Sequence, residues 1–464
     1  MSDPVAELAR IVPAGWLVGG SVRDRLLERE TADYDVAIAG PVVDAARMLG
    51  RAAGGYAFEL SEAFGAWRVV AHDRAWQVDV LPLNGATIEE DLARRDFTIN
   101  AIAAPLAEPG YVDPFHGLED LRGRRVRAVS PDVFERDPLR TLRLARIACE
   151  LGFAVDRETL ELARRAAPAL AGVAPERMFV ELRRVVCGPA ALRGLDLMDD
   201  VGVTEVILPE LAALRGVEQS RFHHLDVADH TRSVLAEAIA LERDPERLAG
   251  AEAPALTAYL AAPLANELNR AQALRFGALL HDIAKPQTRA VTPQGRVTFM
   301  GHDEAGARLA SDILGRLRAS ERLRDHVAAL TRHHLRLGFM VHEMPLSRRA
   351  VYDYLHATAP VAVDVTLLSV ADRLATRGDN AERAIAKHLT LARQMLAEGL
   401  AWIADPPRPP LRGDELARAL GIKPGPMVGG LLAELEAASF SGEVATREEA
   451  IARARELFAA DPKG

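Results

Sequence analysis

Residues 15–40 read GWLVGGSVRDRLLERETADYDVAIAG, in which a glycine pair precedes two aspartates separated by one residue. The apolar residues 16–18 predict a short strand, the glycine pair predicts the tight turn that ends it, and residues 21–27 predict a helix. A second apolar run at 36–39 predicts another strand directly after the aspartates. The stretch therefore predicts a strand, a turn, a helix and a strand around one cluster of polar residues.

The glycine turn is a candidate phosphate site. Backbone N–H groups at the start of a helix are unpaired, and Gly19 and Gly20 carry no side chain that would keep an oxyanion away from them. Ser21 and Arg23 would add a hydroxyl group and a positive charge. We therefore expect a phosphate-bearing ligand at this turn.

Asp33 and Asp35 are candidate catalytic residues and magnesium ligands. Residues two apart on a strand project to one face at a spacing of roughly 6.6 Å, so both carboxylates can hold the same pair of divalent cations. Mg²⁺ favours carboxylate oxygens and substrate phosphates over a cage made only of protein atoms. An isolated Asp-x-Asp is usually a solvated acidic turn, but its position after the glycine turn favours the metal site.

Further β-like segments follow the two aspartates. Residues 41–53 predict a helix, and segments 58–60, 67–71 and 76–81 predict strands. The last segment contains Asp79, which is a candidate third carboxylate for the metal site. Asp79 could equally well be an aspartate on an edge strand that binds no metal.

Two later segments carry further motifs. Residues 88–104 read IEEDLARRDFTINAIAA, and residues 134–153 read FERDPLRTLRLARIACELGF, which predicts one amphipathic helix with an arginine stripe from Arg140 to Arg146. Together with the glycine turn and the aspartates, these segments resemble the class II tRNA nucleotidyltransferases and the bacterial poly(A) polymerases. Those enzymes belong to the DNA polymerase β-like nucleotidyltransferase superfamily.

The resemblance implies which residues contact the nucleotide. It places a pair that reads the Watson–Crick edge of C or A at Asp137 and Arg140. A guanidinium group matches phosphate oxygens, and carboxylate or amide groups can bind ribose hydroxyls. By itself, each motif would indicate ion pairs on a solvated helix face. The sugar and phosphate contacts implied by the resemblance are Gly20, Arg23, Arg95, Asp96, Asn100, Arg143 and Arg146.

The chain departs from the family in two places. Only residues 82–90 join the strand at 76–81 to the second motif, whereas relatives that add C, C and A usually have a longer flexible loop. The short loop resembles that of CC-adding members and puts addition of the terminal A in doubt. Family members also usually have glutamate where this chain has Arg136, which reverses the charge next to Asp137.

A second group of motifs begins at His223-His224 and ends at Ala371-Asp372-Arg373. It resembles HD-domain metal phosphohydrolases, in which histidines and aspartates on separate helices converge on a transition metal such as Ni²⁺, Mn²⁺ or Zn²⁺. Such a metal would supply hydroxide for attack on phosphorus. A lone buried histidine is more often only hydrogen bonded. The implied ligands are His230, His281, Asp282 and Asp372, with His302 and either His333 or His334 for a second ion.

The expected fold class is α+β. It comprises a small N-terminal head with a mixed β-sheet of the nucleotidyltransferase type, an all-α neck, a helical HD domain and a helical tail. The tail follows a proline-rich linker, and its sequence predicts two short helices around a Pro-Gly turn. It resembles the family's tRNA-binding tail, although a role in packing alone explains the sequence nearly as well. The expected boundaries are 1–130, 131–215, 216–403 and 404–464.

Composition narrows the function. The net charge of −9 argues against a protein that coats nucleic acid, and no apolar run is long enough for a membrane span, so we expect a cytoplasmic protein. The motifs together predict a template-independent tRNA 3′-end nucleotidyltransferase that uses Mg²⁺, CTP and ATP, acts on tRNA and needs no obligate protein partner. The alternatives are a CC-adding or A-adding specialist, a poly(A) polymerase, and a metal phosphohydrolase whose front domain only binds RNA.

Overall fold

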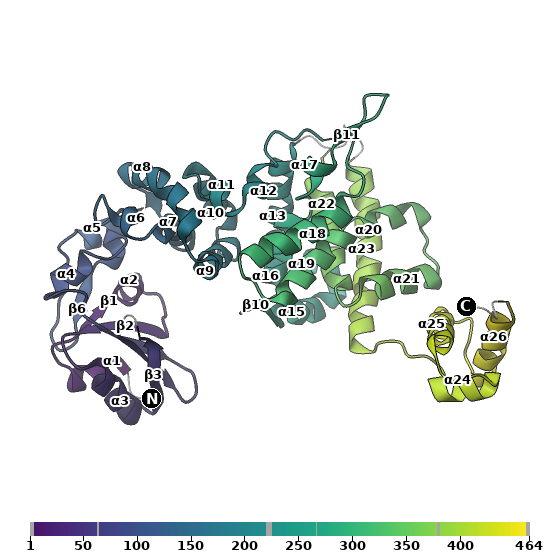
Figure 1. Cartoon of the computed structure of the whole chain (residues 1–464), viewed down its shortest axis with the longest axis horizontal. Helices are drawn as coiled ribbons and strands as arrows, with labels where there is room; N and C mark the ends of the chain where they lie inside the picture. Colours follow the sequence, from purple (N-terminus) through teal and green to yellow (C-terminus); the bar gives the residue numbers. More distant parts are fainter. Residues whose placement is uncertain (1–3, 63–64, 220–224, 266, 378–380, 461–464) are drawn as a thin grey trace. The chain divides into compact units, whose positions relative to one another are not determined.

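The computed structural model describes residues 4–62, 65–219, 225–265, 267–377 and 381–460. The chain forms two compact units, Met1–Ile207 and Leu208–Gly464 (Figure 1). The first unit contains a β-sheet followed by helices, and the second is almost entirely helical. The predicted α+β class is therefore confirmed.

The sheet of the first unit brings the glycine turn next to the two aspartates. Its strands lie in the order β3-β4-β5-β2-β1-β6, and all neighbours are antiparallel except β2 and β5. Val18 ends β1 and lies opposite Asp35 near the start of β2, so Gly19 follows directly beside the aspartates. The strands are β1 (Trp16–Val18), β2 (Asp33–Ile38), β3 (Gly55–Ser61), β4 (Ala66–Ala71), β5 (Gln77–Pro82) and β6 (Ala103–Pro105).

β2 changes character along its length, which explains why a site forms at its start. Asp33 is exposed, whereas Val36, Ala37 and Ile38 are buried. The helix α3 packs on β3, β4 and β5 and closes the core on that side. The helices around the sheet are α1 (Pro4–Ile11), α2 (Gly20–Leu26), α3 (Val42–Ala53), α4 (Ile88–Leu92), the 3₁₀ helix η1 (Thr98–Asn100) and α5 (Gly117–Arg122).

The single helix predicted over residues 134–153 is wrong. The chain forms two helices there, with Asp137 in an extended conformation between them. Proline disfavours a helical backbone at the residue before it, so Pro138 separates the two helices. The sequence also did not predict a parallel pair of two-residue strands, β7 and β8, at the start of the helical region. The elements of this region are β7 (Arg125–Val126), α6 (Val133–Arg136), α7 (Leu139–Leu151), β8 (Ala154–Val155), α8 (Arg157–Ala166), η2 (Ala167–Gly172), α9 (Pro175–Val186), α10 (Ala191–Asp200) and α11 (Val203–Ile207).

The second unit is organised around α22 (Ala362–Ala375), in which nearly every residue is buried. α22 packs against α13 (Val227–Arg243), α16 (Arg270–Leu280) and α23 (Ala381–Ala404). The other elements are α12 (Pro209–Ala212), α14 (Glu246–Ala249), η3 (Gly250–Glu252), α15 (Ala253–Ala261), β9 (Pro263–Ala265), β10 (Leu268–Asn269), α17 (Lys285–Thr288), β11 (Ala290–Val291), β12 (Val297–Thr298), α18 (His302–Arg316), α19 (Glu321–His333), α20 (Arg336–Met340), η4 (Val341–Glu343) and α21 (Arg348–Thr358).

Membrane-spanning potential was assessed for the described helices. Among them, no single helix is both long enough and apolar enough to cross a bilayer. α21 and α22 meet the criteria of length and composition only when taken together, and they are bent by 99° relative to each other.

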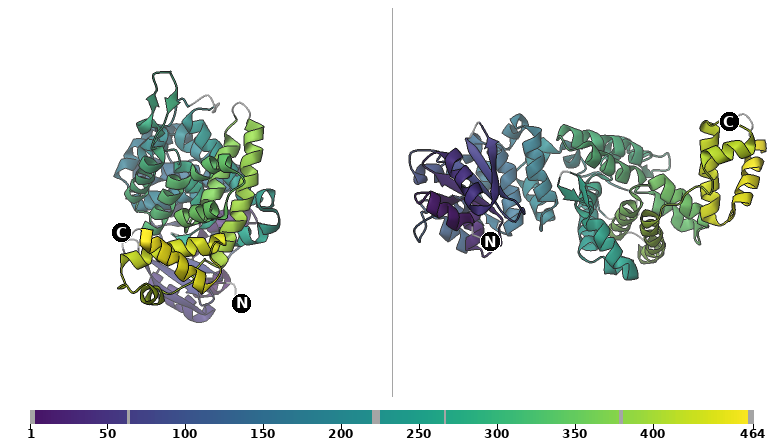
Figure 2. Two further views of the ribbon diagram at one scale, coloured as in Figure 1. Left: turned by 90° about the vertical axis from the view of Figure 1, so that its right-hand side faces the viewer. Right: turned by 90° about the horizontal axis from the view of Figure 1, so that it is seen from below.

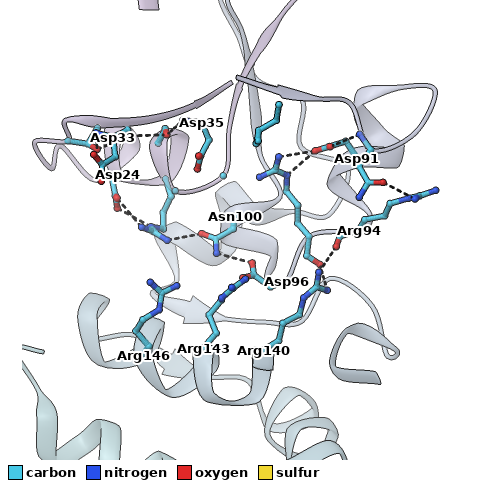
Figure 3. A pocket seen from close by; sticks show the side chains of 18 of the residues that line it. Asp24, Asp33, Asp35, Asp91, Arg94, Asp96, Asn100, Arg140, Arg143 and Arg146 are labelled. Carbon is cyan, nitrogen blue, oxygen red and sulfur yellow. Dashed lines mark hydrogen bonds and ion pairs between the residues drawn. The ribbon is translucent and has the colours of Figure 1, made fainter. Parts of the chain in front are cut away.

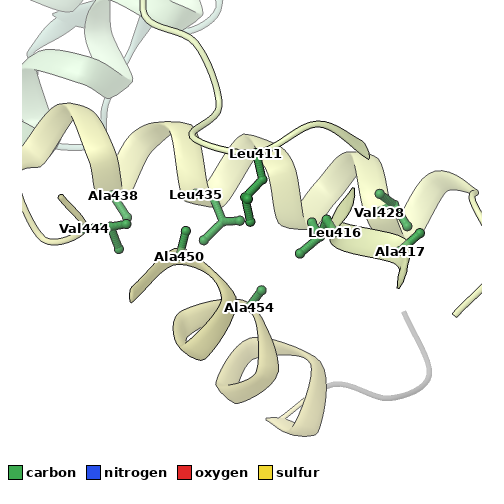
Figure 4. Packing of buried hydrophobic residues seen from close by; sticks show 9 residues of the cluster. All are labelled: Leu411, Leu416, Ala417, Val428, Leu435, Ala438, Val444, Ala450 and Ala454. Atoms are coloured by element: carbon green, nitrogen blue, oxygen red, sulfur yellow. The ribbon is translucent and has the colours of Figure 1, made fainter. Parts of the chain in front are cut away.

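Three helices form the C-terminal tail, one more than the sequence predicts. They are α24 (Gly413–Leu420), α25 (Pro426–Ser441) and α26 (Arg447–Ala460), drawn in yellow in Figure 2. They enclose a small apolar core, to which Leu416 and Leu435 contribute fully buried side chains (Figure 4). Arg349 of α21 binds both carboxylate oxygens of Glu434 on α25, at 2.8 and 2.9 Å, so the tail is attached to the rest of the unit.

Candidate functional sites

A cavity of about 800 Å³ in the first unit brings together most of the candidate residues of the head and neck (Figure 3). α2, β2, the segment 81–100 and α7 contribute its walls. Of the candidates, Asp79 and Asp137 do not line it. Those that do are Gly19, Gly20, Ser21, Arg23, Asp33, Asp35, Arg95, Asp96, Asn100, Arg140, Arg143 and Arg146.

Asp33 and Asp35 are held at the start of β2 by Ser21. The Ser21 hydroxyl accepts a hydrogen bond from the Asp35 N–H (2.8 Å) and donates one to the Asp33 carbonyl oxygen (3.2 Å). This hydroxyl therefore fixes the backbone between the aspartates. Burial raises the pKa of Asp35 to about 6, and the negative charges of Asp79 and Asp33 add to the effect.

Asp79 lies directly across from Asp35 on the parallel neighbour β5. Arg68 of β4 binds both of its carboxylate oxygens, with distances of 2.6 Å from Nε to Oδ1 and 2.8 Å from Nη2 to Oδ2. Asp79 thus acts on Asp35 through its charge while its own oxygens are held by Arg68. Its role as a third metal ligand stays a prediction.

The glycine turn makes close contact with Arg95 and Asp35. Gly19 has a φ of +69°, and a Cβ atom at this position would lie 2.8 Å from Arg95 Nη1 and 3.4 Å from Asp35 Oδ2. Any larger residue would be strained and would displace the guanidinium group. Arg95 is itself oriented by Asp91, which lies 3.0 Å from Nε and 2.9 Å from Nη2.

A chain of hydrogen bonds crosses the floor of the cavity. Arg23 Nη1 donates to Asn100 Oδ1 (2.7 Å), and Asn100 Nδ2 donates to Asp96 Oδ1 (2.9 Å). Arg143 Nη1 then donates to Asp96 Oδ2 (3.3 Å), which links the head to the helix α7. Burial alone would raise the pKa of Asp96, but Arg143 and Asn100 lower it, so the carboxylate stays ionised.

Glu181 of α9 completes this network, and sequence reasoning missed it. It is 5% exposed and binds Arg143 Nε (3.0 Å) and Arg146 Nε (2.7 Å). The sequence places position 181 only within the all-α neck. A glutamate on the apolar face of a predicted helix is the one signal that could have drawn attention to it, because buried charges are normally paired.

Arg140 lines the cavity and Asp137 does not, and both side chains contact other residues. Arg177 Nη2 donates to Asp137 Oδ2 (2.8 Å). Arg140 donates from Nη2 to the Arg94 carbonyl oxygen (2.8 Å) and from Nη1 to that of Arg95 (3.1 Å). Arg140 Nε is buried and has no hydrogen-bond partner in the part of the chain that the structure describes.

In the second unit, residues from α13, α18 and α22 and from the segments that follow α16 and α19 form a compact cluster. Ligand atoms of His230, His281 and Asp282 lie within 4.8 Å of one another, and those of Asp282, His302 and His334 do the same. Asp372 Oδ1 lies 3.0 Å from His230 Nε2. Asp282 is shared by the two groups, so the cluster fits two metal ions.

Three of the histidines are oriented in the same way. Nδ1 of His281, His302 and His334 each bonds to the carbonyl oxygen three residues earlier, at 2.9, 2.6 and 2.6 Å. Nδ1 must then carry the proton, which leaves the Nε2 lone pair to face the cluster, as metal ligation requires.

Two charge states in the cluster suit a metal, whereas for His281 burial is outweighed by the charge of Asp282, which raises the pKa of the ring. Burial lowers the pKa of His334 to about 4, so this ring is neutral. Burial alone would raise the pKa of Asp372, but His230 lowers it well below its usual range. Neutral imidazole and ionised carboxylate are the forms that bind cations.

The structure distinguishes His334 from its neighbour. His334 belongs to the cluster, whereas His333 accepts a hydrogen bond from Arg336 Nε (3.1 Å) outside it. His223 and His224 lie outside the described residues. Sequence reasoning missed Lys285, whose Nζ lies 2.6 Å from Asp282 Oδ2 and which is 6% exposed.

Comparisons with known proteins agree with these two sites. Residues 15–127 match the model of the poly A polymerase head domain, residues 152–214 match the probable RNA and SrmB-binding site of polymerase A, and residues 250–377 match the HD domain. The chain is 36% identical to an A-adding tRNA nucleotidyltransferase of Deinococcus radiodurans over 94% of either protein. It is 37% identical to a CC-adding tRNA nucleotidyltransferase of Thermus thermophilus, over 93% of this chain and 91% of that protein.

The chain belongs to the tRNA nucleotidyltransferase and poly(A) polymerase family.

A further family member matches over less of this chain. A multifunctional CCA protein of Halorhodospira halophila is 35% identical over 68% of this chain and 72% of its own length. Among solved structures, a CCA-adding enzyme in complex with CTP has the same fold, with a TM-score of 0.65 and 19% identity over 99% of this chain and 94% of that one. The cavity residues from Gly19 to Asn100 lie in the segment that matches the head domain. His281, Asp282, His302, His334 and Asp372 lie in the segment that matches the HD domain.

The raised pKa of Asp35 predicts a pH-dependent stability. The charged form disfavours the folded state, so in the presence of EDTA we expect Asp35→Asn to stabilise the first unit by about 1 kcal/mol at pH 8. The gain should shrink as the pH falls through about 6 and vanish below about 4, where the unfolded chain is protonated too. Thermal unfolding from pH 4 to 8 measures it, with Glu59→Gln, an exposed residue of β3, as the control. Equal melting temperatures for Asp35→Asn and wild type at pH 8 would contradict it.

Proposed function

We propose that the chain is a tRNA 3′-end nucleotidyltransferase that transfers C or A from CTP or ATP without a template and releases pyrophosphate. One observation carries the proposal: Asp33 and Asp35 lie side by side next to a glycine turn, in a cavity that α7 lines with arginines. Acidic residues for metal ions and cations for a triphosphate are the two components that phosphoryl transfer needs.

The two aspartates fit Mg²⁺. Their carboxylates are oxygen ligands at one edge of the cavity, and Asp35 carries an unfavourable charge that a cation would compensate. Bound Mg²⁺ ions would activate the tRNA 3′-hydroxyl group and stabilise charge on the triphosphate. Arg68 holds Asp79, whose negative charge adds to that of Asp35.

The arginines would hold the triphosphate and orient it for in-line attack. Arg95 Nη1 lies at the glycine turn, where a phosphate can also approach the backbone. Arg23, Arg143 and Arg146 face the same cavity, and each is positioned by a carboxylate. A guanidinium group held in this way loses little conformational freedom when it binds phosphate.

Base selection would fall to Asp137 and Arg140. Arg140 lines the nucleotide cavity, and its guanidinium group would donate to an acceptor on the base. Asp137 would accept from the exocyclic amine that C and A share and that U and G lack at this edge. Since Arg177 occupies one oxygen of Asp137, the incoming base would have to compete with that ion pair.

We further propose that the chain adds only one kind of nucleotide, and that this is C. The relatives that match its whole length act as A-adding or CC-adding specialists, whereas the CCA protein matches two thirds. The short loop is also tied down: Asn84 N–H bonds to Asp91 Oδ1 (3.0 Å), Ala86 N–H to Glu90 Oε2 (2.8 Å) and Arg94 Nη1 to Asn84 Oδ1 (2.9 Å). The whole-length similarity to an A-adding enzyme keeps A addition as the second candidate.

The HD domain supports a second proposed activity, metal-dependent phosphohydrolysis. The cluster supplies mixed nitrogen and oxygen ligands that suit Ni²⁺, Mn²⁺ or Zn²⁺, and a bound metal would provide hydroxide at neutral pH. Cavities of about 880 and 720 Å³ reach this cluster, and both are lined by His334 and Asp372. Lys285 and Arg373 provide positive charge for a phosphate group.

The remaining assignments follow from the same proposal. Because tRNA and nucleoside triphosphates are cytoplasmic, we place the reaction in the cytoplasm. We retain the division at 130, 215 and 403 into head, neck, HD domain and tail, and we propose that the tail contacts tRNA near the Pro-Gly turn that contains Lys423.

An extension assay tests the transfer reaction. Three tRNA substrates are used: one that lacks the 3′-terminal CCA, one that ends after the first C and one that ends after CC. Each is incubated with CTP or ATP, and the products are sized. We expect two additions from CTP and none from ATP on the CC form, because the site is set for one base. Addition of A to the CC form alone would indicate an A-adding enzyme, and long A tracts would indicate a poly(A) polymerase.

The two aspartates provide the matching mutational test. We expect Asp33→Ala to lower incorporation at least about 10³-fold because it removes a metal ligand, while Glu59→Gln leaves it unchanged. Incorporation that survives Asp33→Ala would refute the assignment. Wild type that binds tRNA but adds no nucleotide would favour a phosphohydrolase whose front domain only binds RNA.

Substitutions at two adjacent histidines test the proposed metal site of the HD domain. Turnover of p-nitrophenyl phosphate or 2′,3′-cyclic AMP with Ni²⁺, Mn²⁺ or Zn²⁺ should fall at least about 100-fold in His334→Ala and in His281→Ala, because each loses a ligand. His333→Ala, altered at the neighbouring position outside the cluster, should stay within about threefold of wild type. Nucleotide incorporation should be the same in all three variants. Equal effects at positions 333 and 334 would refute the proposed ligand set.

A further inference from the structure

Arg136, where the family usually has glutamate, bridges α6 to the end of α4. Its Nη1 donates to the carbonyl oxygen of Ala93 (3.1 Å), and its Nε and Nη2 each lie 2.7 Å from Asp132 Oδ2. Asp132 orients the guanidinium group from one turn earlier. A glutamate could not donate to this carbonyl oxygen and would repel it.

Arg140 acts on the same short segment. It donates to the carbonyl oxygens of Arg94 and Arg95, the two residues that follow Ala93. α4 ends at Leu92, and carbonyl groups at a helix end lack partners within the helix and carry partial negative charge. Two guanidinium groups, one from α6 and one from α7, thus bind three consecutive carbonyl oxygens at 93–95.

The segment 93–95 carries two side chains of the nucleotide site. Arg94 holds the short loop through Asn84, and Arg95 reaches the glycine turn. A cavity of about 580 Å³ beside the nucleotide cavity is lined by Arg94, Arg136 and Arg140, so the three guanidinium groups lie together. Movement of residues 93–95 would shift the short loop at 82–90 and the triphosphate contact Arg95 relative to Asp137 and Arg140.

We propose that Arg136 is a positioning residue that fixes the segment 93–95 against Asp137 and Arg140, and thereby restricts the site to one nucleotide. This inference rests on the proposed nucleotidyltransferase function. C and A offer the same exocyclic amine to Asp137 but differ by a ring in size, so one site accepts both only if its walls can move. Arg136 connects residues 93–95, which hold the short loop at 82–90, to α6, the helix directly before Asp137.

The proposal differs from a surface ion pair in what it predicts. The Arg136–Asp132 pair alone is largely exposed, with side-chain exposures of 42% and 47%, and such pairs contribute little to stability. Arg157 forms a comparable exposed pair with Glu161 in the same unit, with the same sequence spacing and no contact with the nucleotide cavity. Arg157→Ala is therefore a matched control.

The test compares the nucleotides in one assay. The kcat/KM for CTP and for ATP is measured for wild type, Arg136→Glu, Arg136→Lys and Arg157→Ala. All four proteins are given the same tRNA substrates as in the extension assay. In Arg136→Glu we expect the ratio of preferred to non-preferred nucleotide to fall about tenfold, with the KM for tRNA unchanged. Arg136→Lys, which keeps one donor, should recover part of the ratio, and Arg157→Ala should match wild type.

A second measurement does not depend on activity. Trypsin cleaves after arginine, and release of the segment should expose the bonds that follow Arg94 and Arg95. We expect cleavage there at least threefold faster in Arg136→Glu than in Arg157→Ala, at temperatures where both remain folded. Arg136→Gln replaces Arg136→Glu if the latter does not fold.

The outcomes separate this inference from the function on which it rests. Wild type that adds neither nucleotide to any acceptor would overturn the proposed function and this inference with it. Wild type that adds nucleotides, with an unchanged C-to-A ratio in Arg136→Glu, would overturn the positioning role alone. An equal loss for both nucleotides would also overturn it, because it would leave the choice between C and A unaffected.

Discussion

Two like charges have to stay close together at the start of β2, and much of the front site follows from this constraint. Strand geometry projects Asp33 and Asp35 to one face, and Ser21 fixes the backbone between them. Burial and the neighbouring carboxylates raise the pKa of Asp35, which shows that its charge is unfavourable there. Arg68 binds Asp79 and so limits the excess of negative charge. What remains is a site whose electrostatic energy falls when a cation binds.

The opposite wall of the cavity carries an excess of positive charge, because α7 presents three arginines to it. Glu181 and Asp96 compensate part of this charge: each binds Arg143, and Glu181 also binds Arg146. Buried ion pairs seldom add much net stability, but removal of one partner leaves an uncompensated charge and is strongly destabilising. The carboxylates therefore hold the arginines in fixed positions without cancelling all of their charge, which leaves the wall attractive to a triphosphate.

How much the sequence predicts depends on how local each feature is. The glycine turn and the aspartates lie within one short stretch, so their motif predicts the succession of strand, turn, helix and strand around one cluster of polar residues. Glu181 lies 38 residues after Arg143, and only the packing of α9 on α7 brings them together. His333 and His334 are adjacent, so the rotation of the chain at the end of α19 decides which one joins the cluster. Pro138 fits near the start of a helix, and α7 does begin directly after it, but this does not by itself predict a separate helix over residues 133–136.

Rigidity around the base-reading pair has a consequence for specificity. Arg177 holds Asp137, and Arg136 with Arg140 holds the segment that carries the short loop. Such a clamp suits an enzyme that adds C only and one that adds A only, and whole-length relatives of both kinds are known. In the proposed reaction C and A would present the same amine to Asp137, so hydrogen bonding at that carboxylate would not choose between them. The choice would then depend on the space between Asp137, Arg140 and residues 82–90, because a pocket of fixed size that fits a pyrimidine excludes a purine by overlap.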